Sequence, residues 1–362
     1  MDAEVAIVGA GVVGCATALA LARRGAVVTL LEAEREPGLA ASGTNSGIVH
    51  TGFDSAPGEL ETELILRSAA LRGPVFEALG LPLLRCGAVL HGAPAELLEN
   101  ARRNGVETRL VDGALEVPGE AVTDPVAYTL ALAAAAQRLG ADLRMGFRVE
   151  AIEAAVLQSA GGERLSARVI VNCAGLGADE VARLAGDDSF GIYPRKGEFL
   201  VFDSPEPLDQ ILLPLPTKRT KGVLVFPTLD GKVVAGPTAV DGEDKHDWSV
   251  RPEARDEILP KAVAMWPPLE GAAQVGAYAG LRPAGRDGAN YLIAASAACE
   301  SLVNVAAIRS TGLTASLGIA ERVCEIVRGL GVPLGAEMPL EAVAPIPDER
   351  PWWRRTAEYR AA

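Results

Sequence analysis

Three glycines near the N-terminus have the spacing of a phosphate-binding turn. The segment Gly9-Ala10-Gly11-Val12-Val13-Gly14 fits GxGxxG, and Glu32 follows Gly14 by 18 residues. In such a turn Gly9 permits the tight bend, Gly11 lets the backbone approach a pyrophosphate, and Gly14 lets helix and strand pack closely. Glu32 would accept hydrogen bonds from ribose hydroxyls, and its charge would repel a 2′-phosphate. The pattern predicts binding of an adenine dinucleotide, with a purely structural glycine turn as the alternative.

The segments around these glycines have the patterns that such a turn requires. A buried strand is predicted over Glu4–Val8, a helix over Val12–Arg24 and a second buried strand over Val27–Leu31. Gly25 stands where a C-cap glycine ends a helix. The start of the helix would then present free N–H groups and the positive end of its dipole to the phosphates.

The loop after Glu32 helps to distinguish between dinucleotides. Within Glu34–Gly47 the residues Ala40-Ala41-Ser42-Gly43-Thr44-Asn45-Ser46-Gly47 are small, and half of them are polar. A long loop of this composition can surround a bulky flavin and its phosphates with backbone, so it favours FAD over NAD. An ordinary surface loop is the alternative.

The rest of the chain alternates between two kinds of segment. Helical patterns cover Pro57–Gly80, the residues from Asp124-Pro125 to Gly140, and part of Ser301–Val327, whereas strand patterns cover Leu81–Val122, Arg148–Val171 and Tyr193–Pro237. We therefore expect an α/β fold whose dinucleotide-binding domain takes residues 1–80, 140–190 and 275–344. A β-rich substrate-binding domain would take residues 81–139 and 191–274. Residues 345–362 would form a C-terminal tail that packs along the surface.

Composition excludes several classes of protein. The formal net charge of −13 argues against a nucleic-acid partner, because phosphate backbones require clustered cations. It does not exclude a small anionic substrate, which a few arginines can hold. No apolar run reaches the roughly 18 residues of a membrane span, so we expect a cytoplasmic protein with no integral membrane segment. The five cysteines and three histidines are dispersed without metal-binding spacing, so no metal site is expected.

Five motifs stand in order along the chain. They are Gly9–Gly14 with Glu32, Ser42-Gly43-Thr44-Asn45-Ser46-Gly47, Val169-Ile170-Val171-Asn172-Cys173-Ala174-Gly175-Leu176-Gly177-Ala178-Asp179, Gly280-Leu281-Arg282-Pro283 and Ser310-Thr311-Gly312-Leu313-Thr314. This ordered set resembles the D-amino-acid oxidase superfamily of FAD-dependent oxidoreductases, also called the DAO family, over nearly the whole chain. The resemblance implies FAD as cofactor. It also implies a Rossmann-like FAD-binding domain of the DAO and glutathione-reductase type, with a discontinuous mixed-β substrate domain.

Within that superfamily one segment resembles particular branches. Asn45-Ser46-Gly47-Ile48-Val49-His50-Thr51-Gly52 is similar to the NSGvvHaG motif of glycerol-3-phosphate and L-2-hydroxyglutarate dehydrogenases, and the segments at 194–198, 217–225 and 236–239 are similar to the type 2 glycerol-3-phosphate dehydrogenase-like branch. Two positions depart from the aerobic glycerol-3-phosphate enzymes. Gly312 stands where a lysine is common, and Phe53-Asp54 stands where an arginine is common. Phosphate recognition therefore does not follow from the resemblance.

The resemblance implies hydride transfer from a carbon beside an alcohol or amine to flavin N5. This requires a proton acceptor, an anchor for the anion and exclusion of water. His50 is the expected base because imidazole titrates near neutral pH, with a structural histidine as the alternative. Arg282 first, and Arg309 second, would hold the anion, with salt bridges between domains as the alternative.

The expected FAD-binding residues come from all five motifs and from one strand beside them. They are Gly9, Gly11, Val13, Gly14, Glu32, Ala33, Ser42, Thr44, Asn45, Ser46, Gly47, Val149, Ala174, Gly175, Gly280, Arg282, Gly312, Leu313 and Thr314. The last three precede an apolar helix, so their N–H groups would stabilise the negative N1–C2=O region of reduced flavin. Lys196, Lys218, Arg219 and Lys221 are interpreted as a solvated basic face.

The sequence thus predicts FAD-dependent oxidation of a small 2-hydroxy acid or polyol phosphate, similar to glycerol 3-phosphate. Electrons would pass to O2 or another acceptor, and a homodimer and contact with a membrane surface are both compatible with the sequence. One alternative is an amine or amino-acid oxidase on the same fold, and another is a flavoprotein that binds FAD for structure or sensing. A pyridine-nucleotide reductase is disfavoured because a second GxGxxG is absent.

Overall fold

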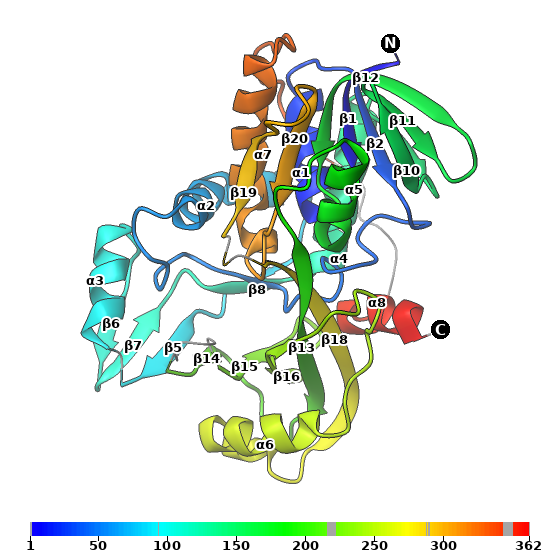
Figure 1. Ribbon diagram of the computed structural model, residues 1–362. Helices are drawn as coiled ribbons and strands as arrows, with labels where there is room; N and C mark the ends of the chain where they lie inside the picture. The colour runs from blue at the N-terminus through cyan, green and yellow to red at the C-terminus, as the bar shows by residue number, and fades with distance from the viewer. Residues whose placement is uncertain are drawn as a thin grey trace.

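A mostly parallel sheet forms the upper half of the molecule (Figure 1). The computed structural model describes residues 2–92, 94–215, 222–286, 288, 290–342 and 350–361. The first sheet has the strand order β10-β11-β12-β1-β2-β9, with β20 beside β12 and β19 beside β20. Its strands are β1 (Ala3–Val8), β2 (Val28–Glu32), β9 (Asp142–Met145), β10 (Val149–Glu153), β11 (Val156–Ser159), β12 (Arg164–Asn172), β19 (Leu292–Ala295) and β20 (Leu302–Ala306). The pairs β1–β12, β1–β2, β2–β9 and β12–β20 run parallel.

Helices cover both faces of this sheet because its central strands are apolar on both sides. On β1, Val5 and Ile7 belong to one hydrophobic cluster, and Ala6 and Val8 belong to another. On the first face pack α1 (Val12–Ala22), α4 (Pro125–Arg138) and α7 (Gly312–Gly329), and α2 (Leu60–Ala78) packs on α7. On the second face packs α5 (Ala178–Leu184), directly after the 3-10 turn η1 (Gly175–Gly177). The predicted strand, turn, helix and strand at the N-terminus are confirmed.

A second, mixed sheet forms the lower half (Figure 1). Its order is β17-β13-β16-β15-β14-β5-β7-β6, with β18 beside β13. The strands are β5 (Ala88–His91), β6 (Arg109–Val111), β7 (Ala114–Val117), β13 (Ile192–Asp203), β14 (Ile211–Leu213), β15 (Leu224–Pro227), β16 (Val233–Gly236), β17 (Val240–Asp241) and β18 (Ala273–Gly285). β13 and β18 form the longest ladder, from the pair Ile192–Gly285 to the pair Asp203–Ala273.

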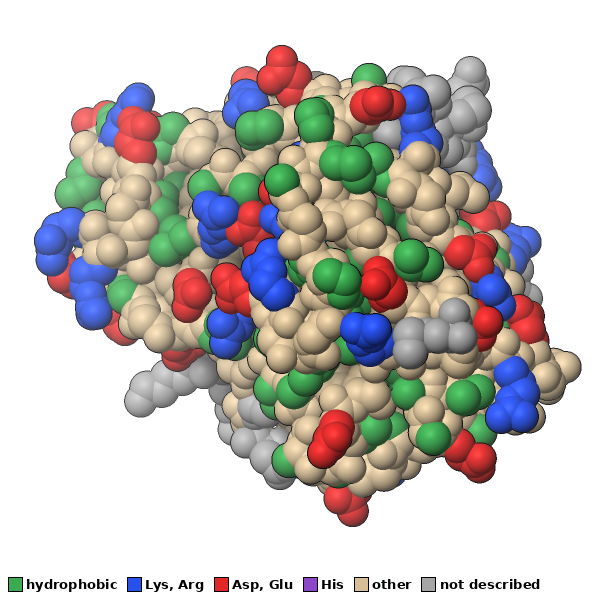
Figure 2. Space-filling view, turned by 90° about the horizontal axis from the view of Figure 1, so that it is seen from above, with side chains coloured by type: hydrophobic (Ala, Val, Ile, Leu, Met, Phe, Trp, Pro, Cys, Tyr) green, Lys and Arg blue, Asp and Glu red, His purple; other side chains and the backbone are tan. Residues whose placement is uncertain are grey.

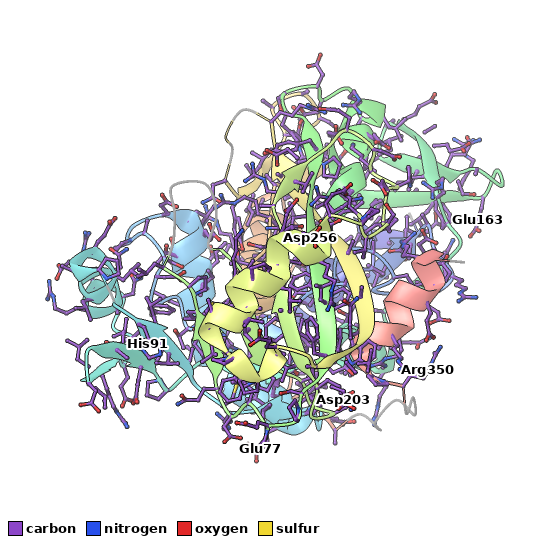
Figure 3. The ribbon with its side chains drawn as sticks, turned by 90° about the horizontal axis from the view of Figure 1, so that it is seen from below. Glu77, His91, Glu163, Asp203, Asp256 and Arg350 are labelled. Atoms are coloured by element: carbon purple, nitrogen blue, oxygen red, sulfur yellow. The ribbon has the colours of Figure 1, made fainter. Side chains whose placement is uncertain are left out.

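Two helices cover the second sheet. Ala254, Ile258 and Ala262 of α6 (Ala254–Met265), which is followed by η2 (Pro267–Leu269), pack against the strands, and Asp256 lies on the same helix (Figure 3). α3 (Ala95–Arg103) packs on the opposite end of the sheet through Leu97 and Ala101. The prediction that Leu81–Val122 holds only strands and turns is therefore wrong at α3, whose apolar residues are too few for a long periodic pattern.

A small third sheet links the loop after Glu32 to the rest of the chain. It has the order β3-β8-β4, from β3 (Ile48–Val49), β8 (Ala121–Thr123) and β4 (Leu83–Leu84). β8 pairs antiparallel with both of its neighbours. The residues just after β3 and just before β8 are thereby brought together.

The packing differs from the predicted division of the chain in two places. α4 packs on α1 and belongs to the core beneath the first sheet, although residues 81–139 were assigned to the β-rich domain. β18 pairs with β13 in the second sheet, although residues 275–344 were assigned to the dinucleotide-binding domain. In both places an element packs in a different domain from the segments next to it in the sequence. Tertiary contacts, rather than order along the chain, decide where an amphipathic element is buried.

The end of the chain is a helix, α8 (Trp352–Ala361), that packs beside β18 (Figure 1). Trp352 and Trp353 are only 2% and 5% exposed, so two buried side chains hold this part of the tail against the second sheet. The ring of Trp353 lies over Gly276, where a Cβ would be 3.1 Å from the ring atom Cε3. The burial of two indoles anchors the helix to the second sheet. Residues 345–349 and 362 of the predicted tail lie outside the described residues.

Over the described residues, no helix is both long and apolar enough to cross a membrane. On the face that Figure 2 shows, acidic and basic side chains are interspersed, so the negative charge is not gathered in one patch there.

Candidate active site

The glycine turn lies between β1 and α1, against the end of β12. Gly9 has φ +104°, and a Cβ there would be 2.8 Å from the carbonyl carbon of Cys173. A Cβ on Gly14 would overlap the carbonyl oxygen of Gly9. At Gly11 the nearest atom to such a Cβ would be Ser42 Oγ, at 3.1 Å. The three glycines thus have different roles. Gly9 and Gly14 let the turn pack closely against β12 and the start of α1, and Gly11 leaves the space beside the start of α1 open.

We expect Gly14→Ala to lose FAD and to unfold at a lower temperature. The added methyl group must displace the backbone at Gly9, and overpacking of this kind typically costs about 1–3 kcal/mol. Flavin absorbance per protein and thermal unfolding would measure the two effects. Gly329→Ala on α7 is the matched control, because a Cβ there meets nothing within 4 Å. A Gly14→Ala protein with full FAD content and an unchanged unfolding temperature would contradict the role of Gly14 in packing the FAD-binding turn.

Glu32 stands at the end of β2 with its carboxylate fixed by backbone N–H groups. Ala10 N donates to Oε2 at 2.6 Å, and Glu34 N donates to Oε1 at 3.0 Å. Burial raises the pKa of Glu32, and the N–H groups of Glu34 and Ala10 act against this rise. Each oxygen keeps further lone pairs, so the side chain can accept hydrogen bonds from ribose hydroxyls, as the sequence predicts.

A cavity of about 300 Å³, here called the dinucleotide cavity, lies along the turn and Glu32. Most of the predicted FAD-binding residues line it: Gly9, Gly11, Val13, Glu32, Ala33, Ser42, Asn45, Val149, Ala174, Gly175, Gly312 and Leu313. Two helix starts face it. The first turn of α1 receives one acceptor, Ser42 Oγ, at 2.9 Å from Val12 N, and the remaining first-turn N–H groups of α1 and α7 have no acceptor within their own helices. These groups fit an anionic ligand.

A second cavity of about 420 Å³, here called the reaction cavity, adjoins the first. The predicted residues that line it are Thr44, Asn45, Ser46, His50, Gly280, Arg282 and Arg309. Ala41, Asn45 and Arg309 line both cavities, so the two spaces meet there. An elongated cofactor with a pyrophosphate in the middle fits this arrangement, and the residues present therefore fit FAD.

Three predicted FAD-binding residues line neither cavity. Gly14 packs against Gly9, and Gly47, with φ +78°, is in close contact with the backbone of Thr123. Thr314 Oγ1 accepts a hydrogen bond from the backbone N–H of His50 at 3.1 Å. These residues shape the cavity walls rather than line them.

His50 lies at the wall of the reaction cavity and is held by a buried carboxylate. Its Nδ1 is 2.8 Å from Glu120 Oε2, and Glu120 is fully buried. The other oxygen of Glu120 accepts hydrogen bonds from Thr51 N at 2.6 Å and from Thr51 Oγ1 at 2.8 Å. Below the loop, Arg72 donates to the backbone carbonyls of Val49 and His50 at 3.2 and 2.8 Å. Both the ring and the backbone of His50 are thus fixed.

The charge of Glu120 decides which nitrogen of His50 carries the proton. Burial by itself raises the pKa of Glu120, but interaction with the His50 ring and hydrogen bonds from His50 and Thr51 hold that pKa below its ordinary value. Glu120 is therefore ionised at neutral pH and can only accept, so His50 Nδ1 donates to it. In the neutral ring Nε2 is then the nitrogen that can accept a proton.

We expect Glu120→Gln to slow flavin reduction by substrate about 10- to 100-fold while FAD stays bound. The variant keeps the shape of the side chain but loses a hydrogen bond to a charged group, typically about 1.5–3 kcal/mol. Stopped-flow measurement of flavin bleaching and FAD content would check both statements. Glu116→Gln, on the partly exposed Glu116 of β7, is the control. Reduction at the wild-type rate would show that Glu120 does not position His50.

The same pair predicts a dependence of stability on pH. The pKa of Glu120 is lower in the folded protein than in the unfolded chain. Its contribution to stability is therefore present above its unfolded pKa, about 4.3, and is lost as the pH falls through the lower folded value. Thermal unfolding measured from pH 6 downwards should show a shallower acid loss in Glu120→Gln than in the wild type. Parallel curves would contradict this assignment.

Arg282, the first candidate for an anion anchor, lies on β18 and lines the reaction cavity. Its Nη2 donates to the carbonyl oxygens of Thr238 at 2.6 Å and Lys196 at 3.2 Å. Burial, and then the nearby Arg195, lower the pKa of Arg282 to about 10, so it stays charged at neutral pH. Gly197 makes room for the guanidinium, because a Cβ there would be 3.1 Å from Cζ of Arg282. Donors not used by the two carbonyls are free for an anion.

Arg195 is a second guanidinium in the reaction cavity that was not predicted to take part. It pairs in register with Arg282 across the β13–β18 ladder. Asp241 Oδ2 lies 2.9 Å from Arg195 Nη2, which also donates to the hydroxyl of Tyr193 at 3.0 Å. Two adjacent cations therefore face one cavity, and only one of them has a carboxylate partner among the described contacts.

Arg309, the second candidate, is engaged in an ion pair. Its Nη2 lies 2.6 Å from Glu61 Oε2, and the same carboxylate accepts from Thr311 Oγ1 at 2.5 Å and Asn290 Nδ2 at 2.9 Å. Burial raises the pKa of Glu61, but the hydrogen bond from Thr311 and the charge of Arg309 bring it below its ordinary value. Arg309 therefore forms a salt bridge, but with a residue of the same predicted domain rather than between domains, and it lines both cavities.

The interpretation of Lys196 as part of a solvated face is wrong. Lys196 is 7% exposed, and its ammonium lies 2.5 Å from Asp247 Oδ2 and 3.0 Å from the carbonyl of Ser249. The other members of that cluster, Lys218, Arg219 and Lys221, lie outside the described residues. Among the described residues no group of three or more His, Cys, Asp or Glu side chains could hold a metal ion.

Comparisons with known proteins agree with this geometry. Residues 4–326 match the model of the DAO family, described as FAD dependent oxidoreductase. The chain is 28% identical to the glycerol 3-phosphate dehydrogenase of Caloramator mitchellensis, over 90% of this chain and 74% of that protein. It is 28% identical to the mitochondrial L-2-hydroxyglutarate dehydrogenase of Bos taurus, over 68% of this chain and 64% of that protein. Its structure is similar to that of dithionite-reduced L-alpha-glycerophosphate oxidase from Mycoplasma pneumoniae with FAD bound, with a TM-score of 0.84. The two sequences are 25% identical, and the match covers 95% of this chain and 99% of that chain.

Proposed function

The chain belongs to the DAO family of FAD-dependent oxidoreductases, and we propose on that premise that it oxidises the alcohol of a small anionic substrate, either a 2-hydroxy acid or a polyol phosphate similar to glycerol 3-phosphate. The observation that carries the proposal is the reaction cavity itself. His50, fixed by the buried Glu120, lines one part of it, and the cationic pair Arg195 and Arg282 lines another. A base and an anion anchor in one cavity are what the oxidation of an anionic alcohol requires.

The residues divide the reaction between them. Arg282 binds the anion of the substrate through the N–H groups that the two carbonyls leave free, and thereby fixes the carbon that reacts. His50 Nε2 takes the hydroxyl proton, and the carboxylate of Glu120 stabilises the imidazolium that results. FAD, when bound, supplies the acceptor for the hydride that leaves the same carbon, so the alcohol becomes a carbonyl. Phe199, Leu224 and Phe226 give the cavity an apolar wall that excludes water.

A panel of substrates tests the proposal. Holoenzyme would be mixed without oxygen with glycerol 3-phosphate, L-2-hydroxyglutarate, lactate, glycerol and glycine, and bleaching of the flavin would be followed. We expect bleaching with at least one anionic alcohol and a much slower reaction with neutral glycerol. Bleaching by glycine, with release of ammonia, and by none of the alcohols would overturn the proposal.

One feature favours an amine or amino-acid oxidase as the second candidate. Glu59 and Glu61 also line the reaction cavity, so a carboxylate lies in the same space as the guanidinium pair. A cavity with both charges can bind a zwitterion. Glu61 is already bonded to Arg309, Thr311 and Asn290, and Glu59 to Asn290, which leaves less capacity for an ammonium group. We therefore place the anionic alcohol first.

The electron acceptor and the assembly state belong to the same proposal. O2 is the acceptor to test first, by following hydrogen peroxide during turnover, with an artificial dye as the comparison. A homodimer is compatible with the sequence, and the molar mass of the holoenzyme in solution would distinguish it from a monomer.

A further inference from the structure

The dinucleotide cavity is closed by two segments that lie far from the glycine turn in sequence. One is the segment from Lys245 to Trp248, which follows β17, and the other is α8 at the end of the chain, shown with Arg350 labelled just before it in Figure 3. Lys245, His246, Trp248 and Arg360 all line the cavity. Its outer wall is therefore built from residues outside the first sheet.

The two segments meet in one contact. The guanidinium carbon of Arg360 lies 4.8 Å from the centroid of the Trp248 ring, within the range of a cation–π interaction. The indole N–H of Trp248 is buried and has no acceptor among the described residues. Because no hydrogen bond from this N–H fixes the ring, its position depends on packing, and Arg360 provides part of that packing.

Arg360 is in turn bound to the loop that follows Glu32. Its Nε donates to the carbonyl of Leu39 at 2.8 Å, and its Nη1 lies 3.2 Å from Glu34 Oε1. Tyr359 donates from its hydroxyl to the other oxygen of Glu34 at 2.6 Å. Glu34 also donates its backbone N–H to Glu32, the expected ribose-binding residue. A continuous set of contacts thus runs from Glu32 to Trp248.

The segment that carries Trp248 is braced against α5. Lys245 Nζ lies 2.6 Å from Asp179 Oδ1 and 2.8 Å from Glu180 Oε1. Burial raises the pKa of Asp179, but the hydrogen bond and charge of Lys245 bring it below its ordinary value. The segment is therefore held by α5 at Lys245 and by α8 at Trp248, at the edge of the cavity.

We propose that Trp248 and Arg360 are further FAD-binding residues, which together close the dinucleotide cavity on the side of Glu32 and retain the adenosine half of the cofactor. The ring of Trp248 forms the wall, and Arg360 is the positioning residue that ties it to the Glu34 loop. This proposal rests on the cofactor and not on the substrate, so its failure would leave the proposed function unaffected.

The test measures binding rather than turnover. FAD would be removed from the wild type, Trp248→Ala, Trp248→Phe and Arg360→Ala, and the affinity of each apoprotein for FAD and for ADP would be measured by calorimetry. We expect Arg360→Ala and Trp248→Ala to weaken both ligands by about 2- to 30-fold, the range of a cation–π contact. Trp248→Phe should retain most of the affinity, because it keeps an aromatic face and the lost N–H makes no hydrogen bond.

The control is Arg354→Ala. Arg354 lies on the same helix and stacks on Trp353 at 4.8 Å, but it does not line the cavity. The affinity of the Arg354→Ala apoprotein for ADP should equal that of the wild type. The double variant Trp248→Ala with Arg360→Ala should lose no more than the larger single loss, since Arg360 acts on the cofactor through Trp248. Unchanged ADP affinity in Arg360→Ala, a loss in Trp248→Phe equal to that in Trp248→Ala, or losses that add in the double variant would each overturn the proposal.

Discussion

Replacement of His50 by alanine is expected to slow the reduction of bound FAD by substrate about 10²- to 10⁴-fold, the usual contribution of a positioned general base. The side chain lines the reaction cavity, and its Nδ1 is occupied by Glu120, which leaves Nε2 as the proton acceptor. FAD should remain bound, because the glycine turn, Glu32 and both helix starts line the dinucleotide cavity, which His50 does not line. Anaerobic stopped-flow spectroscopy of flavin bleaching would measure the rate.

His91→Ala is the matched control for this experiment. His91 is exposed at the end of β5, and Figure 3 labels it in the cyan lobe of the molecule. In the His91→Ala variant, substrate should reduce the bound FAD at the wild-type rate. If His50→Ala also bleached at the wild-type rate with full FAD content, another group would have to take the proton, and the assignment of His50 would be wrong.

Replacement of Arg282 by alanine is expected to lower kcat/KM for an anionic substrate by about 30-fold or more. Truncating one partner of a buried, hydrogen-bonded charge pair costs about 2–5 kcal/mol. Most of the loss should appear in KM, because the anion contributes to binding before and during the reaction. Steady-state kinetics with an anionic alcohol and with its neutral counterpart would show the effect as a loss of discrimination between the two.

Further measurements on Arg282→Ala and one control variant separate the loss of anion binding from damage to the fold. Arg282→Ala leaves the carbonyls of Thr238 and Lys196 without their donor, so thermal unfolding and FAD content must be measured beside the kinetics. Arg286→Ala removes an arginine that is paired with Glu243 at the surface, and it should leave kcat/KM unchanged. Equal discrimination between anionic and neutral alcohols in Arg282→Ala and the wild type would exclude Arg282 as the anchor.

The first elements of the fold could be predicted from the sequence because their signals are local. β1, the glycine turn, α1 and β2 follow each other without interruption, and each has a pattern that its own residues explain. The cap of α4 is equally local, since Asp124 Oδ1 accepts from Val126 N at 2.9 Å and Ala127 N at 2.8 Å. Most predicted cofactor residues line a cavity for the same reason: they belong to contiguous motifs.

The partners of the catalytic candidates could not be predicted in this way. Glu120 reaches His50 because β3 and β8 pair in the small third sheet, although the two residues are 70 positions apart. Arg195 lies beside Arg282 only through the register of β13 and β18. A short strand of two or three residues has no periodic signal, and strand register is set by tertiary packing.

The end of the chain shows the same limit. Prolines and polar residues before Trp352 indicate a surface tail, yet the two indoles are buried and α8 reaches the dinucleotide cavity. Adjacent tryptophans in a polar segment were the available signal, because such large apolar side chains are costly to leave in water.

The ladder of β13 and β18 limits how the chain can change in length. Arg195 and Arg282 stand directly opposite each other, and both line the reaction cavity. Side chains alternate between the faces of a sheet, so inserting or deleting a single residue in either strand ahead of the arginine would turn its guanidinium to the opposite face. Insertions that preserve the cationic pair are therefore confined to the connections outside this ladder, such as the residues between β13 and β14.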